Sequence, residues 1–431
     1  MFFTVSGGPF GLEGLVGNVG PGVAILLLVL TPLLYSVPET LIVGELASML
    51  PAEGGYYQWV KRAFGRFAGF TNGWLSWMYS LIDMAIYPVL FLQYLRFFTG
   101  PLGPLPSWGL ALALIWGATW LNLRGTRTVG IASGWFTVLV LAPFAVLAGV
   151  ALLRWSAHPG AAFAAVPFRA GGTTFLGALG LGISQSVWNY SGWDNASTVG
   201  GEIENAGATY PRALLRALPL VTVAYLLGVV PALAVSDWRL WTDGAWPAIA
   251  ETVAGRWLAA WIAAAGMISA FALFNALLLV YSRVPLVLAR DGLLPAALGV
   301  TDERGTPRRA VVASAAGYSI FALLSFGGLL AADVLLYTAA LAMEFAALLA
   351  LRRREPELRG AFRVPLRAPV LAVLAALPVL VLAVAVVLEV RSRTIGLVGV
   401  LVATACGIAG PLAYAAFRPI SPSPTDRSRT G

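Results

Sequence analysis

Four carboxyl side chains lie inside long apolar stretches of the sequence, at Glu39, Asp83, Asp194 and Glu344. None has a Lys or Arg within four residues, so a helical neighbour cannot neutralise any of them. A carboxyl group in hydrocarbon favours its neutral form and can carry a proton, while its ionised form can hold a cation. A hydrogen-bonded structural acid is the alternative for each. Glu13 is expected near the outer surface, where it is solvated or attracts cations.

Two apolar stretches are interrupted by glycine, at Ser6-Gly7-Gly8-Pro9-Phe10-Gly11 and at Trp188-Asn189-Tyr190-Ser191-Gly192-Trp193-Asp194. Glycine and proline at this density do not hold a regular helix, and each N–H and C=O freed in hydrocarbon needs a partner. Freed carbonyls suit an amine, freed N–H groups suit a carboxylate, and aromatic rings attract cations. Such breaks in two halves of a chain are typical of a midplane binding site in a secondary transporter. Close packing of small residues is the alternative.

The elements that must position these residues are membrane-spanning helices. Of the 431 residues, 59% are hydrophobic and only 11% charged, and apolar runs of about 20 residues recur throughout. We expect an all-α integral membrane protein with twelve helices, at roughly 2–17, 21–48, 67–98, 106–123, 128–153, 173–200, 212–235, 250–288, 309–329, 331–351, 368–389 and 394–417. They form one domain over 1–417, and the tail 418–431 is expected to be disordered in the cytoplasm.

The net charge of +8 has a topological explanation. Of the 28 Lys and Arg residues, 21 fall in alternate connections that include both termini, so the positive-inside rule predicts a plasma-membrane protein with both ends in the cytoplasm. A nucleic-acid partner is therefore not needed to explain the charge.

The sequence lacks the motifs of an enzyme. A single cysteine, Cys406, and a single histidine, His158, exclude an internal disulfide and a Cys/His metal cluster. Nucleophile–base pairs and phosphate-binding loops are absent, so we expect no catalytic residue, metal or cofactor and no ATP-driven transport.

Several blocks together resemble a known family. They are the first glycine break with the Leu12-Glu13 that follows it, Pro38-Glu39-Thr40-Leu41, Pro51-Ala52-Glu53-Gly54-Gly55-Tyr56, Trp59-Val60-Lys61-Arg62-Ala63-Phe64-Gly65, Ile82-Asp83 with Tyr87-Pro88, Trp188-Asn189 with Trp193-Asp194, Gly201-Glu202-Ile203-Glu204-Asn205, Ala289-Arg290-Asp291-Gly292-Leu293-Leu294-Pro295 and Glu344-Phe345. In this order they resemble the amino acid–polyamine–organocation superfamily, most closely its polyamine uptake branch, which is related to the L-type amino acid transporters.

The resemblance implies a leucine-transporter-type fold with two inverted five-helix repeats, about 1–154 and 172–351, in which helices one and six are broken, plus two extra helices at 368–417. It implies substrate contacts at Ser6, Gly7, Gly8, Phe10, Trp188, Asn189, Tyr190, Trp193 and Asp194, and proton coupling or cation binding at Glu39, Asp83 and Glu344. Only six residues precede Gly7 in this sequence, fewer than half a membrane span, so we expect the natural protein to start earlier.

The leading function is secondary transport of a small amino compound by alternating access, with a proton as the co-transported ion. Four membrane acids favour a polyamine. Met84 and Gln93, where that branch often has more polar or acidic residues, favour an amino acid permease or exchanger. A substrate sensor without transport is a remote alternative.

Overall fold

The computed structural model describes residues 5–124, 127–157, 175–392 and 397–417, which form helices and loops without a strand. Eight segments among them are long and apolar enough to cross a bilayer: Pro21–Met49, Arg66–Thr99, Thr137–Trp155, Ala206–Val235, Arg256–Arg290, Phe326–Arg354, Ala368–Ser392 and Val398–Phe417. The expected all-helical, multi-pass class is confirmed, while the count of twelve spans and the inverted repeats stay predictions. His158 and the tail 418–431 lie outside the described residues.

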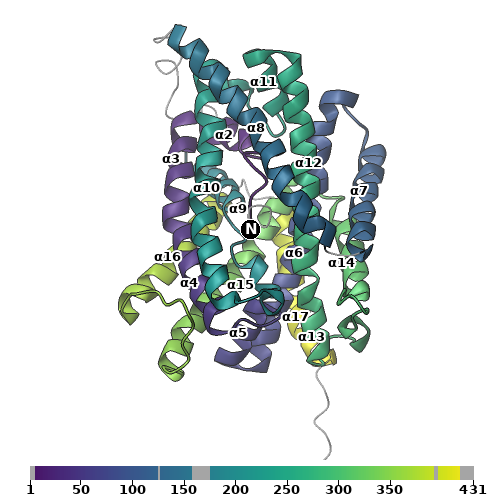
Figure 1. Ribbon diagram of the computed structural model, residues 1–431, viewed down its shortest axis with the longest axis vertical. Helices are drawn as coiled ribbons and strands as arrows, with labels where there is room; N and C mark the ends of the chain where they lie inside the picture. Colours follow the sequence, from purple (N-terminus) through teal and green to yellow (C-terminus); the bar gives the residue numbers. More distant parts are fainter. Residues whose placement is uncertain (1–4, 125–126, 158–174, 393–396, 418–431) are drawn as a thin grey trace, which may run out of the picture.

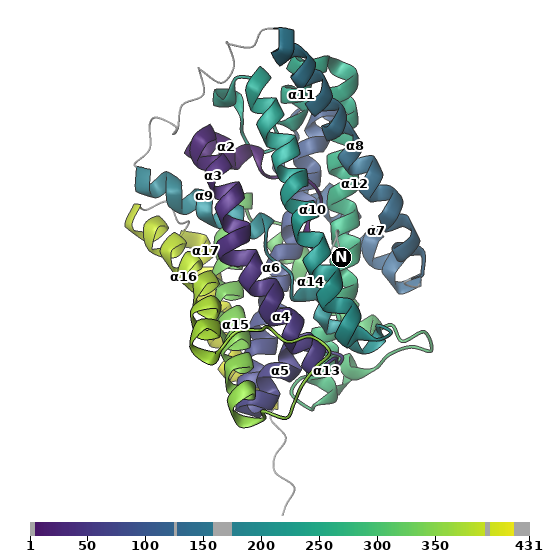
Figure 2. The same ribbon diagram turned by 60° about the vertical axis from the view of Figure 1, so that its left-hand side comes forward.

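The helices form an elongated bundle around three central members (Figures 1 and 2). In the centre, α6 (Arg66–Thr99) packs against both α12 (Arg256–Tyr281) and α15 (Phe326–Arg354). The surrounding helices are α3 (Pro21–Thr31), α4 (Val37–Met49), α8 (Arg127–Ala157), α9 (Phe175–Asn189) and α10 (Ala206–Val235). On opposite flanks lie α16 (Ala368–Ser392) with α17 (Leu397–Phe417), and α7 (Pro104–Arg124) with α14 (Arg308–Phe321).

A wide π-helical turn, Pro32–Ser36, joins α3 to α4 within one continuous span. Pro32 has no N–H to donate, which loosens the regular helical pattern there. The turn directs the Ser36 hydroxyl to the carbonyl oxygen of Tyr190, at 3.1 Å, and precedes Glu39 by one helical turn. π-Turns of this kind are frequent at functional sites. This one links the span that carries Glu39 to the end of α9.

Three predicted boundaries differ from the structure. The stretch expected as one helix over 250–288 is divided in two places. Gly255, at φ +87°, separates α11 (Trp246–Ala254) from α12, and a turn at Ser282 separates α12 from α13 (Arg283–Arg290). The junction expected at 329–331 lies earlier, since α14 ends at Phe321 and α15 starts at Phe326. There the Ser325 hydroxyl accepts the N–H of Gly328 at 3.3 Å and caps the helix. The short helix α5 (Gly55–Phe64) was not predicted.

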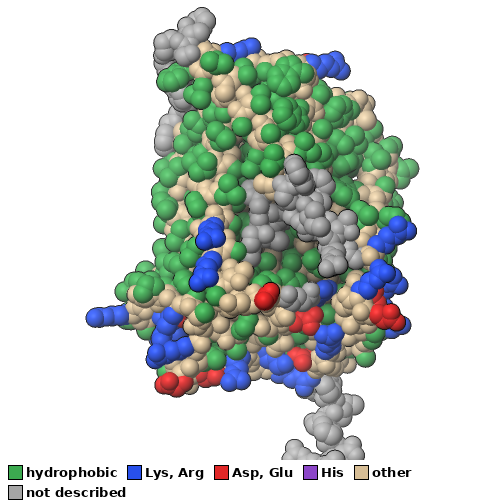
Figure 3. Space-filling view, viewed as in Figure 1, with side chains coloured by type: hydrophobic (Ala, Val, Ile, Leu, Met, Phe, Trp, Pro, Cys, Tyr) green, Lys and Arg blue, Asp and Glu red, His purple; other side chains and the backbone are tan. Residues whose placement is uncertain are grey.

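Charged side chains gather at the end of the bundle that carries α5 and α13 (Figure 3). Ion pairs connect the inner segments there: Arg290 and Arg283 lie 2.7 and 3.7 Å from the Glu53 carboxylate, and Lys61 pairs with Asp291. The Arg62 guanidinium, hydrogen-bonded to Glu355, lowers the pKa of that carboxyl below its ordinary value. This is the end that the charge count assigns to the cytoplasm.

Candidate functional site

The first glycine break is unwound in the structure. Residues 6–12 are non-helical, with Gly8 and Gly11 at φ +99° and +85°, and α2 (Glu13–Val19) starts only after them. Side chains from distant helices bind the freed carbonyls, since the Ser269 hydroxyl donates to Gly7 O at 2.5 Å and the Trp246 indole donates to Pro9 O at 2.8 Å. The backbone is therefore held open by tertiary contacts, as hydrocarbon requires.

The second break is also unwound. The helix α9 ends at Asn189, Gly192 adopts φ +92°, and a 3-10 turn follows at Asn195–Thr198. The Tyr225 hydroxyl donates to Asn189 O at 2.6 Å, and the Trp193 indole donates to Tyr190 O at 2.7 Å. As in the first break, side chains stabilise the irregular backbone.

The two breaks lie against each other. The amide of Gln185 on α9 donates to Gly11 O at 2.8 Å, and a Cβ built on Gly11 would lie 3.1 Å from the Trp188 ring. A single cavity is lined by both breaks: Val5, Ser6, Gly7, Gly8 and Phe10 from the first, and Trp188, Asn189, Ser191, Gly192 and Asn195 from the second. The rest of its wall comes from α6 (Tyr79, Asp83, Tyr87, Leu90), α10 (Tyr225), α12 (Ser269, Leu273, Tyr281) and α15 (Asp333, Tyr337).

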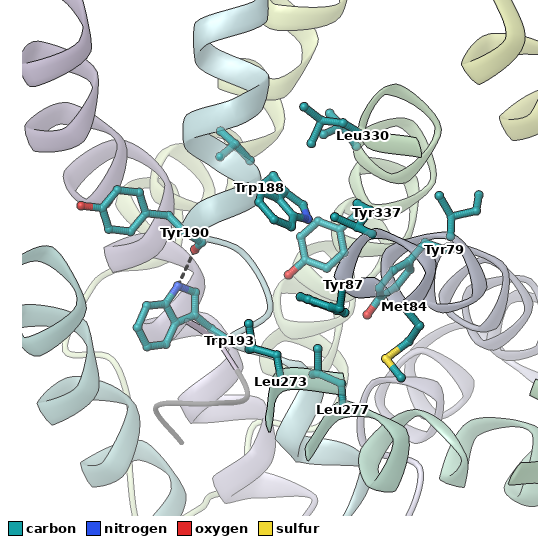
Figure 4. Close-up of a cluster of buried hydrophobic side chains, with 14 of the residues drawn as sticks. Tyr79, Met84, Tyr87, Trp188, Tyr190, Trp193, Leu273, Leu277, Leu330 and Tyr337 are labelled. Carbon is teal, nitrogen blue, oxygen red and sulfur yellow. Dashed lines mark hydrogen bonds between the residues drawn. The ribbon is translucent and has the colours of Figure 1, made fainter. Parts of the chain in front are cut away.

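Seven of the twelve predicted site residues line this cavity: Ser6, Gly7, Gly8, Phe10, Asp83, Trp188 and Asn189. The other five, Glu39, Tyr190, Trp193, Asp194 and Glu344, lie behind its wall. Figure 4 shows the Tyr190 and Trp193 rings on the side away from Trp188, and the Tyr190 hydroxyl donates to Leu28 O at 3.0 Å. In this conformation these two rings support the break, and their contact with a substrate stays a prediction.

Asp83 is held at the cavity wall by three donors. The Trp188 indole donates to Oδ1 at 3.2 Å, the Tyr281 hydroxyl donates to Oδ2 at 3.0 Å, and the Tyr87 hydroxyl lies 3.2 Å from both oxygens. An ionised carboxylate accepts hydrogen bonds and donates none, so these three donors suit the charged form of Asp83.

Two further hydrogen bonds determine that the Tyr281 hydroxyl is the donor in its contact with Asp83. The Tyr79 hydroxyl donates to Asn195 Oδ1 at 2.8 Å, and the Asn195 amide donates to the Tyr281 hydroxyl at 2.9 Å. The hydrogen of Tyr281 is thereby left for Asp83. Tyr79, Asn195 and Tyr281 were not among the predicted residues, because their convergence depends on how α6, α12 and the 3-10 turn Asn195–Thr198 pack.

Tyr337 joins two buried acids behind the wall. Its hydroxyl oxygen lies 2.6 Å from Glu39 Oε1 and 2.9 Å from Asp194 Oδ1, and it accepts the N–H of Gly192 at 3.2 Å. A tyrosine hydroxyl has one hydrogen to donate. For both carboxyl contacts to be hydrogen bonds, one of the two acids must carry a proton and donate it to Tyr337.

Glu344 belongs to the same buried region. Its Oε1 lies 3.5 Å from the Asn72 amide, and Glu344 Oε2, Glu39 Oε2 and Asp194 Oδ2 have no hydrogen-bond partner within the described part of the chain. Buried charges are stable only when paired and hydrogen-bonded. The partnerless oxygens therefore favour the protonated form for at least one of these three acids.

Two acids differ from expectation. Glu13 is fully buried rather than exposed, because Oε1 accepts from the Tyr94 hydroxyl at 2.7 Å and from Gly244 N–H at 3.0 Å, while Oε2 accepts from Gly11 N–H at 2.9 Å. The loop before α11 covers it, and no sequence pattern indicates that. Asp333, on the cavity wall, was not predicted. The helix start expected at 331 puts Asp333 at a helix end, whereas α15 starts at Phe326 and carries it two turns inside.

Comparison with known proteins agrees with this architecture. A family model described as amino acid permease matches residues 1–416. The polyamine transporter RMV1 of Arabidopsis thaliana is 36% identical over 369 residues, which are 85% of this chain and 74% of the relative. The polyamine transporter PUT1 of Oryza sativa subsp. japonica is 36% identical over 373 residues, 85% of this chain and 68% of the relative. The chain therefore belongs to the amino acid permease family, in the branch of these polyamine transporters, and is a membrane transporter rather than an enzyme.

Proposed function

We propose that this chain moves polyamines across the plasma membrane by alternating access coupled to protons. The observation that carries the proposal is Asp83, a buried carboxylate held by three donors at the wall of the cavity between the breaks. The rings of Trp188 and Tyr87 flank it, with centroids 6.5 Å apart. A carboxylate beside aromatic faces suits an ammonium group. The named activity of the two relatives supports the same substrate class.

The unwound backbone of the two breaks is less suited to binding the carboxylate of an amino acid. Its N–H groups would have to bind that carboxylate, but Gly8 N–H already donates to the Ser6 hydroxyl at 3.2 Å and Gly11 N–H donates to Glu13 at 2.9 Å. Gly192 N–H of the second break donates to Tyr337. An incoming carboxylate would have to displace these acceptors and would also approach Asp83. An amino acid permease or exchanger is accordingly the second candidate, and the match to the amino acid permease family is what favours it.

The coupling proton resides, in this proposal, on the pair Glu39 and Asp194. Tyr337 lines the cavity and contacts both acids, so it connects the substrate space to the proton site. Glu39 follows the π-turn and Asp194 follows the break after α9, two places where the backbone can change its angle. Loss of the shared proton would place two negative charges around one hydroxyl, and their repulsion would favour rearrangement of these segments.

Uptake into proteoliposomes tests the proposal. We expect labelled putrescine and spermidine to accumulate, with accumulation depending on an imposed pH gradient, and a neutral amino acid to be ignored. Empty liposomes and a gradient collapsed by a protonophore are the controls. Accumulation of a neutral amino acid with no uptake of either polyamine would contradict polyamine transport and favour the second candidate. Polyamine uptake that is insensitive to the pH gradient would contradict only the proton coupling.

A further inference from the structure

The cavity contains a second carboxylate, Asp333. It is only 5% exposed, and α15 places it one helical turn from Tyr337, so that both side chains face the cavity. Its Oδ1 is buried and has no hydrogen-bond partner among the described residues. This differs from Asp83, whose two oxygens are both bonded by donors of the protein.

The two acids share one environment. Tyr87 on α6 and Tyr281 on α12 both bond Asp83, and both line the same cavity as Asp333. The described residues that line the cavity include no Lys or Arg. A buried carboxylate without a partner is costly, so a cation from outside the protein is the natural partner for Asp333.

We propose that Asp333 is a second ammonium subsite, so that the transporter selects diamines whose two charged ends contact Asp83 and Asp333. The inference rests on the proposed polyamine function and adds the residue that binds the second ammonium group of the substrate. A diamine neutralises both acids, whereas a monoamine leaves one of them unpaired. A zwitterionic amino acid brings its own carboxylate toward one of the two acids, which costs free energy through like-charge repulsion.

The wall between the subsites suits a methylene chain. The Trp188 and Tyr87 rings both line the cavity, with centroids 6.5 Å apart, and Leu90 and Leu273 add apolar side chains to the same wall. Figure 4 shows Trp188, Tyr87 and Tyr337 grouped around the same space. Aromatic faces there bury apolar carbons and attract the charged ends of the same molecule.

Equilibrium binding to the purified, full-length protein tests the subsite. The probes are putrescine and n-butylamine, which have the same carbon chain and differ in one ammonium group. We expect the wild type to bind putrescine more tightly by about 30-fold, because a second desolvated charge pair forms. Asp333→Asn is expected to weaken putrescine binding by about 30-fold and to change butylamine binding by less than about threefold. Asp237→Asn, in an exposed outer loop, is the matched control.

Two outcomes overturn the subsite. The first is that the Asp333→Asn variant keeps the wild-type preference for putrescine over butylamine. The second needs no variant: the wild-type protein binds putrescine and butylamine with equal affinity. If Asp333→Asn does not fold, Asp333→Glu keeps the charge and is expected to retain the preference for two ammonium groups. The uptake experiment distinguishes this from failure of the polyamine function itself, because the wild type would then accumulate a neutral amino acid and neither polyamine.

Discussion

The hydroxyl of Tyr337 lies 2.6 Å from Glu39 Oε1, joining α15 to the span that contains the π-turn. Tyr337 also lines the cavity between the two helix breaks. One residue therefore lines the cavity and contacts a buried acid.

Tyr337→Phe is expected to separate proton coupling from substrate binding. Removal of the hydroxyl breaks the bridge between Glu39 and Asp194 and leaves polar atoms unsatisfied, which costs about 1–3 kcal/mol of stability. In proteoliposomes, accumulation with and without a pH gradient should approach equality, while putrescine binding to the purified variant stays close to wild type.

Tyr318→Phe is the control for this variant. Tyr318 is buried on α14, and its hydroxyl has no hydrogen-bond partner among the described residues, so its loss should leave coupling intact. If accumulation by Tyr337→Phe still depends fully on the pH gradient, the proton moves by a route that does not include this hydroxyl.

Asp83→Asn is expected to raise the KM for putrescine by about 30-fold, because a buried charge partner of the ammonium is lost. The amide also presents an N–H₂ group to the hydroxyl and indole donors that now bond the carboxylate, which lowers stability by about 1–3 kcal/mol. Uptake kinetics and thermal unfolding in detergent measure the two effects. A well-folded variant with the wild-type KM would remove Asp83 from the substrate site.

Gly7→Ala is expected to disrupt the first break. A Cβ at Gly7 would lie 2.2 Å from Ser269 Oγ and 2.5 Å from Leu273 Cδ1. The Ser269 hydroxyl cannot withdraw without losing its bond to Gly7 O. Overpacking of this kind costs about 1–3 kcal/mol, and uptake should fall with it. Gly117→Ala on α7, where a Cβ meets nothing within 4 Å, is the control and should unfold no earlier than wild type. Normal stability and uptake in Gly7→Ala would contradict this packing.

The sequence predicts the breaks well because glycine and proline act on their own backbone. The glycines and the proline of residues 7–11 disfavour a regular helix through their own backbone, and so does Gly192. The sequence does not predict the direction in which side chains point after a break. Once helical periodicity ends at Asn189, no spacing rule tells which way Tyr190 and Trp193 point, and tertiary contacts place their rings away from the cavity.

Asp333 was missed for a related reason. The apolar run from 310 to 351 contains no charged residue except two acids, so hydropathy alone does not locate the turn at 322–325. That turn depends on the Ser325 cap, and it decides whether Asp333 sits at a helix end or inside the membrane. A local signal was present, since Asp333 has no Lys or Arg within four residues and lies one turn from Tyr337.

The last prediction concerns Arg352, which holds the inner connection against the bundle. Its guanidinium donates to the buried Glu45 carboxylate at 2.6 Å and to Val364 O at 2.8 Å, while Val364 N–H donates to Glu45 Oε2 at 2.8 Å. Arg352→Ala leaves Glu45 buried without its charge partner, so we expect a loss of about 3 kcal/mol or more in thermal unfolding experiments. Arg62→Ala is the matched control, because the Arg62–Glu355 pair is solvent-exposed and its loss should leave the unfolding midpoint unchanged. Adding Glu45→Gln to Arg352→Ala removes the unpaired charge and should recover part of the loss. Equal midpoints for Arg352→Ala and Arg62→Ala would mean that the buried pair does not anchor this connection.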